Sequence, residues 1–147
     1  MQGQPPVPEP VVLDTNTVLD WLLFRDPRVD RLALALHERR LRWLATPPMM
    51  DELRLVLQRP LGTRWDHARE RLLADSPAID AVLVEPISAA PHHLRCTDAS
   101  DQKFVDLALQ CRARWLVTHD RALLALRRGA ARLGLTIVQP QHWSADG

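Results

Sequence analysis

The sequence has little of several residue types, and each shortage excludes a class of protein. Two cysteines, Cys96 and Cys111, are too few for a disulfide scaffold, so a reducing cytoplasm is the expected compartment. No unbroken apolar run is longer than five residues, which excludes a transmembrane helix and a membrane partner. The net charge is only +1, so the chain is not a polycation that binds nucleic acid by bulk charge. Lys103 is the only lysine, and arginine supplies the other positive side chains.

What remains is the composition of one ordinary globular domain. The chain has 147 residues, of which 46% are hydrophobic and 25% charged. Residues 1–10 contain four prolines and no signal-peptide pattern, and we predict a disordered tail there. We place the domain at residues 11–140 and a second, C-terminal tail at residues 141–147.

Short apolar bursts alternate with stretches of helical spacing. We predict strands at 11–13, 41–45, 82–85, 115–118 and 135–138. We predict helices at 15–24, 31–40, 48–59, 65–73, 101–111 and 121–128. This alternation is typical of an α/β domain built around a parallel sheet.

Four acids occupy informative positions relative to these elements. Asp14 and Asp120 each follow a predicted strand, at the edge where open parallel sheets bind ligands. Glu52 lies beside the apolar stripe of its helix, and Asp101 lies on the core-facing side of the helix that it opens. The spacing therefore favours one acidic cleft at the carboxyl ends of the strands.

Each acid also has a purely structural explanation. Asp101 and Asp120 are suited to capping helices, and taken singly we favour that role for them. Asp14 is equally suited to cap the next helix, and Glu52 to a solvated edge. Taken together, however, gathered carboxylates repel one another unless a cation neutralises them or their pKa values rise. Oxygen donors without nearby cysteine or histidine favour Mg²⁺ or Mn²⁺.

Four motifs then lead to a known family. They are VLDTN at 12–16, Glu52-Leu53, DASD at 98–101 leading into Phe104, and LVTHD at 116–120. Their order and spacing resemble the PIN domain over about residues 11–140. Within that superfamily the chain is most similar to bacterial proteins described as toxin components of toxin-antitoxin systems.

The resemblance implies a three-layer α/β/α sandwich with a central parallel sheet and a metal-dependent ribonuclease acting on single-stranded RNA. Its implied catalytic and metal-binding residues are Asp14, Glu52, Asp101 and Asp120. Its implied supporting residues are Asn16, Thr118 and Asp98, of which Asp98 ranks below Asp101 because only Asp101 has the family's spacing to Ala108. The implied cofactor is Mg²⁺ or Mn²⁺, and the implied partners are RNA, an antitoxin protein and a second copy of the chain in a homodimer.

Basic residues are expected to hold the substrate backbone. Residues 25–71 contain eleven arginines and seven acids, and Arg39, Arg40 and Arg42 form the densest group. We predict RNA binding there. The alternative is a solvated helix face with ion pairs to residues such as Glu38.

Two other functions stay open. Asp14 followed by Thr15 and Asn16 also fits a phosphatase of the haloacid-dehalogenase type, although that chemistry normally has a second aspartate where Asn16 stands. It also needs a lysine, for which Lys103 is the only candidate. The third possibility is a PIN-like scaffold that binds RNA or protein without cleaving it.

Overall fold

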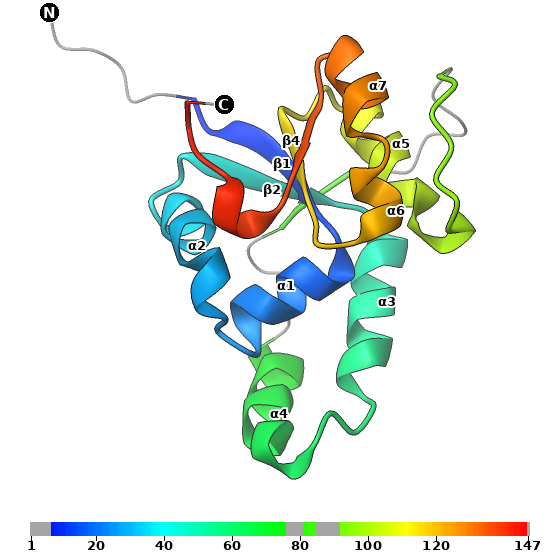
Figure 1. The fold of residues 1–147 in the computed structure, drawn as a ribbon. Coiled ribbons are helices and arrows are strands. Elements are labelled where there is room, and N and C mark those ends of the chain that lie inside the picture. Colours follow the sequence, from blue (N-terminus) through cyan, green and yellow to red (C-terminus); the bar gives the residue numbers. More distant parts are fainter. Residues whose placement is uncertain (1–6, 76–80, 85–91, 147) are drawn as a thin grey trace, which may run out of the picture.

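A computed structural model describes residues 7–75, 81–84 and 92–146, which form an α/β fold around a parallel sheet (Figure 1). The five strands run in the order β3-β2-β1-β4-β5, and every neighbouring pair is parallel. Their bounds are β1 (Glu9–Leu13), β2 (Leu41–Ala45), β3 (Val82–Leu83), β4 (Trp115–Val117) and β5 (Thr136–Val138). The predicted α/β class and parallel sheet are confirmed.

Helices connect these strands and cover the sheet. Their bounds are α1 (Thr15–Leu22), α2 (Asp30–His37), α3 (Pro47–Leu57), α4 (Asp66–Asp75), α5 (Gln102–Gln110), α6 (Arg121–Leu124) and α7 (Arg127–Arg132). Short 3₁₀ turns are η1 (Pro27–Val29), η2 (Thr63–Trp65), η4 (Ala99–Asp101) and η5 (Pro140–His142). No helix within the described ranges is both long enough and apolar enough to cross a membrane.

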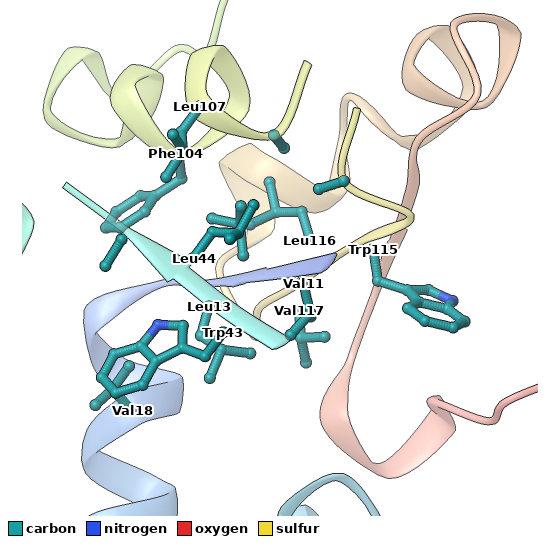
Figure 2. Close-up of a cluster of buried hydrophobic side chains, with 14 of the residues drawn as sticks. Val11, Leu13, Val18, Trp43, Leu44, Phe104, Leu107, Trp115, Leu116 and Val117 are labelled. Carbon is teal, nitrogen blue, oxygen red and sulfur yellow. The ribbon is translucent and has the colours of Figure 1, made fainter. Parts of the chain in front are cut away.

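Alternation along the strands produces three layers. Successive strand side chains point to opposite faces of a sheet. Figure 2 accordingly shows Leu44 on the side of the sheet where Phe104 of α5 lies, whereas the adjacent Trp43 lies on the other side, near Val18 of α1. The central strands β1, β2 and β4 are largely buried on both faces, and their residues are mostly apolar. The result is the predicted α/β/α sandwich.

The first strand starts earlier than the sequence indicated. Glu9 and Pro10 pair with Leu41 and Arg42 of β2, so the tail that we placed at residues 1–10 is wrong at its end. The carboxylate of Glu9 accepts hydrogen bonds of 2.7 and 2.6 Å from Arg114 Nη1, which ties the strand start to the residue before β4. The prolines of residues 1–10 led us to predict a disordered tail, because sequence composition gives no information about these tertiary contacts.

Two predictions at the C-terminal end also need correction. The helix predicted at 121–128 is two helices, since α6 ends at Leu124 and α7 begins at Arg127. Trp143, which we assigned to a tail, is 2% exposed and packs edge-on against Trp115, with ring centroids 5.4 Å apart. An isolated tryptophan after a proline gives no periodic signal, so its burial was not predictable from pattern alone.

Candidate metal centre

Two of the four predicted acids follow adjacent strands. β1 and β4 pair in parallel, with Leu13 opposite Val117. Asp14 follows β1 directly, and Asp120 follows β4 after two further residues, so both acids lie at the same edge of the sheet. Helices α1 and α6 begin at this edge, and each acid is the N-cap of one of them.

Asp14 is held in a buried position by two hydrogen bonds. Its side chain accepts from the backbone N–H of Thr17 at 2.9 Å through Oδ1 and from the Thr118 hydroxyl at 2.5 Å through Oδ2. The residue is only 4% exposed. Burial raises the pKa of Asp14 even though these hydrogen bonds favour its ionised form. A nearby cation would therefore stabilise the charged carboxylate.

Thr118 links the two strand-end acids. Its buried hydroxyl donates to Asp14 and accepts from the backbone N–H of Asp120 at 2.9 Å. Asp120 Oδ1 in turn accepts from the backbone N–H groups of Ala122 and Leu123, at 2.7 and 3.2 Å. Asp120 thus does cap a helix, as its position suggested, but the cap uses only one carboxylate oxygen.

Asp101 does not have the capping role that we favoured for it. It stands at the N-cap of α5, yet its side chain makes no capping hydrogen bond. Instead it is turned toward other acids: burial, followed by the charges of Asp120 and Asp98, raises the pKa of Asp101 to about 6. A hydrogen bond to Asp120 contributes in the same direction. A carboxylate that caps no helix and lies among other acids is typical of a ligand-binding site.

Asp98, Asp101 and Asp120 form a compact group of carboxylates, which we call the three-aspartate group. One oxygen from each lies within 4.8 Å of the others. Asp98 had been predicted only as a supporting residue, and the structure brings it directly into the group. Its Oδ1 is oriented by the backbone N–H and hydroxyl of Ser100, at 3.0 and 2.6 Å. Carboxylate oxygens without sulfur or imidazole are the donor set that Mg²⁺ and Mn²⁺ prefer, so these residues fit such an ion.

Glu52 also lines the cleft and is engaged by other groups. Its Oε2 accepts from the Thr15 hydroxyl at 2.6 Å, and its Oε1 pairs with Lys103 Nζ at 2.8 Å. Partial burial alone would raise the pKa of Glu52, but the hydrogen bonds from Lys103 and Thr15 outweigh it and hold the pKa below its ordinary value. Lys103 also donates to the carbonyl of Ser100 at 2.6 Å. Its role here was missed, although its being the only lysine of the chain was a signal.

All these acids open onto one cleft of about 460 Å³. Its polar lining consists of Asp14, Thr15, Asn16, Glu52, Arg59, Asp98, Asp101 and Asp120. The side chains of Leu55, Val56 and Phe104 form its apolar wall. Asn16 is an exposed part of the lining. The structure thus brings the four predicted acids and Asn16 together, with Thr118 directly behind them.

The three arginines predicted to contact substrate lie elsewhere. Arg39 and Arg40 precede β2, and Arg42 is its second residue, whereas the acids follow the opposite ends of strands parallel to it. Arg40 is also paired with Glu38 at 2.9 Å. None of the three arginines lines the cleft, and binding of RNA by them elsewhere stays a prediction. Arg59, two residues beyond the end of α3, is the arginine that lines the cleft.

A family model described as "PIN domain" matches residues 10–122, which include β1 from Pro10 onward and all of the acids that line the cleft. No curated protein matches the chain.

Proposed function

The chain belongs to the PIN domain family, whose members are generally nucleases, and from this premise we propose a Mg²⁺- or Mn²⁺-dependent endoribonuclease that cleaves single-stranded RNA. The observation that carries the proposal is the three-aspartate group. In it the side chain of Asp101 makes no helix cap, and the pKa of Asp101 is raised to about 6. Without a cation, repulsion among these carboxylates destabilises the folded state. A bound divalent cation would neutralise that repulsion and be held by the same oxygens. The open cleft beside it accommodates a polymer.

The chain's own residues have separable roles in this proposal. Asp98, Asp101 and Asp120 would hold the cation, with Asp14 and Glu52 on the adjoining walls of the cleft. When bound, a divalent cation activates water and offsets the charge that develops at phosphorus. Thr118 orients Asp14 and Asp120 relative to each other, and Arg59 is available to a phosphate because no hydrogen bond or ion pair from its guanidinium to another described residue is found.

The geometry disfavours the phosphatase alternative. A nucleophilic aspartate needs an accessible oxygen, but Asp14 is buried and both of its oxygens accept hydrogen bonds. The lysine which that chemistry requires is paired with Glu52 and donates to the carbonyl of Ser100. A non-catalytic scaffold remains the second candidate, and an activity measurement separates it from the nuclease.

The decisive experiment compares Asp101→Asn with a matched control, Asp51→Asn. Asp51 lies beside Glu52 in the sequence but is an exposed partner of Arg54 and does not line the cleft. Labelled single-stranded RNA is incubated with each protein in Mg²⁺ or Mn²⁺, with and without chelator. We expect Asp101→Asn and chelator each to reduce cleavage by at least about a hundredfold, and Asp51→Asn to leave it unchanged. Cleavage that survives in Asp101→Asn would contradict the assigned site, and no cleavage by the unaltered protein would favour the scaffold.

We further propose that the enzyme is a cytoplasmic toxin whose cleft is blocked by an antitoxin protein. The support is the similarity of its motifs to toxin components of this family. A short reading frame overlapping the start of the gene, whose product suppresses cleavage when co-purified, is the expected finding. A gene standing alone, with no inhibitor encoded beside it, would instead indicate a housekeeping nuclease.

A further inference from the structure

A second hollow, of about 410 Å³, lies on α6 and α7 and is lined by arginines. Its lining consists of Arg121, Leu124, Ala125, Arg127 and Arg128, and we call it the arginine hollow. No acidic side chain contributes to it. Residues 121–145 contain four arginines and no aspartate or glutamate, although the chain as a whole is almost neutral.

Some arginines elsewhere in the chain pair with acids, whereas those of this hollow do not within the described residues. Arg28, Arg40, Arg54, Arg69 and Arg114 each pair with an acid. Within the described parts of the chain, no side-chain hydrogen bond or ion pair is found for Arg121, Arg127 or Arg128. Three guanidinium groups that share one concave surface repel one another, and a polyanion removes that repulsion by bridging them.

The hollow adjoins the metal centre through a single short helix. Asp120 of the three-aspartate group is the N-cap of α6, so Arg121 follows a proposed metal ligand directly. Figure 1 shows α6 leading from the end of β4 into α7. With four residues, α6 is about 6 Å long. The chain therefore carries the first arginine of the hollow next to Asp120 and the other two six and seven residues after Arg121.

Close packing fixes the position of α7. A Cβ atom added to Gly129 would lie 2.7 Å from Cδ2 of the buried Leu94. Because Gly129 follows Arg128 in the same helix, this contact anchors the backbone that carries Arg127 and Arg128. Arg127 and Arg128 thus project from a helix whose backbone is held in place by packing, which reduces the conformational entropy lost on binding.

We propose that the arginine hollow binds backbone phosphates of the RNA strand outside the cleft, and so sets how the strand leaves the metal centre. This inference rests on the proposed ribonuclease function. An acidic protein would also complement the charge, but adjacency to Asp120 favours the substrate itself. Guanidinium forks bind phosphates of any sequence, so the hollow contributes affinity and direction rather than base specificity.

The test compares two double variants with the same change in charge. Arg127→Gln/Arg128→Gln removes two arginines from the hollow, and Arg25→Gln/Arg112→Gln removes two exposed arginines that do not line it. Binding of a labelled single-stranded RNA dodecamer is measured by fluorescence anisotropy in chelator, so that binding is read without cleavage. The salt concentration is varied in each case.

We expect the hollow variant to bind at least about tenfold more weakly, and its slope of log affinity against log salt to be less negative by about 1.4, from two lost phosphate contacts. The control pair should change affinity by less than about twofold. Arg127→Lys/Arg128→Lys should retain most of the salt slope, and thermal unfolding checks that each variant folds. A dinucleotide, which fills only the cleft, should show no difference between the variants.

Three results would overturn the inference: equal losses in the two double variants, no loss in the hollow variant, or displacement of RNA by poly-glutamate as effectively as by unlabelled RNA. The last would identify an acidic protein as the ligand. Failure of the ribonuclease proposal has a different signature. In that case RNA is not cleaved in Mg²⁺ or Mn²⁺, while the dependence of binding on Arg127 and Arg128 persists.

Discussion

Replacing Asp101 with asparagine is expected to stabilise the metal-free protein while it abolishes cleavage. Burial and the charges of Asp120 and Asp98 raise the pKa of Asp101 from 3.8 to about 6. The folded state therefore holds this proton more tightly than the unfolded state. The resulting stability is fully present below the unfolded pKa of 3.8 and is lost as the pH rises through about 6. At neutral pH the ionised Asp101 destabilises the metal-free fold.

The size of this effect follows from the shift. A rise from 3.8 to about 6 corresponds to about 3 kcal/mol, and solvent screening of a carboxyl that is only partly buried reduces it to about 1–2 kcal/mol. Asparagine has no charge, nearly the same shape, and an N–H that can donate to Asp120. We therefore expect the free energy of unfolding to increase by about 1–2 kcal/mol at about pH 7.5, and Tm to rise by roughly 2–8 °C.

The assay is thermal and urea unfolding in chelator at several pH values between about 4 and 8, with Asp51→Asn as the control of equal chemistry. The gain in Asp101→Asn should shrink as the pH falls toward 3.8. Added Mg²⁺ should then stabilise the unaltered protein and not the variant. A variant that is less stable at neutral pH, or whose gain is the same at every pH, would refute the assignment of electrostatic strain to Asp101.

Three further predictions concern residues around the site and the core. Thr118→Val should lower the free energy of unfolding by about 2–3 kcal/mol in urea titrations, because Asp14 and the buried N–H of Asp120 each lose a partner; an unchanged midpoint would contradict this. Trp143→Ala should cost about 3–5 kcal/mol in the same assay, since its ring is buried against the core, whereas a dispensable tail would show no loss. Lys103→Met should raise the pKa of Glu52, so the acidic limb of the pH profile for RNA cleavage should move to higher pH; a profile that does not move would show that the ion pair has no influence on the reaction.

Local pattern was a sound guide wherever the governing interactions are local. The placement of Asp14 and Asp120 near strand ends followed from short apolar runs, which an acid follows directly at Asp14 and after two residues at Asp120. Capping by Asp120 was equally local, since its partners lie two and three residues away. Asp101 has the same type of sequence position as Asp120 but makes no cap, because neighbouring carboxylates from elsewhere in the site determine its environment.

The density of arginines along the chain did not predict which arginines line the cleft. Arg39, Arg40 and Arg42 are close in sequence, but the direction of β2 places them at the edge of the sheet away from the acids. Arg59 lines the cleft, and Arg121, Arg127 and Arg128 gather on two short helices that the sequence suggested were one. The number of arginines in a segment does not predict at which end of a strand, or at which edge of the sheet, they lie.

The sequence by itself determined the α/β class, the parallel sheet and the set of acids, because periodicity and strand-end positions are properties of neighbouring residues. Only the tertiary structure decided how those acids are used. It paired Glu52 with Lys103, 51 residues away, and joined Asp14 to Thr118, 104 residues away. It also gathered Asp98, Asp101 and Asp120 within 4.8 Å and set the arginine hollow beside them. Such contacts depend on strand order and helix packing, which bring distant residues together only when the chain folds.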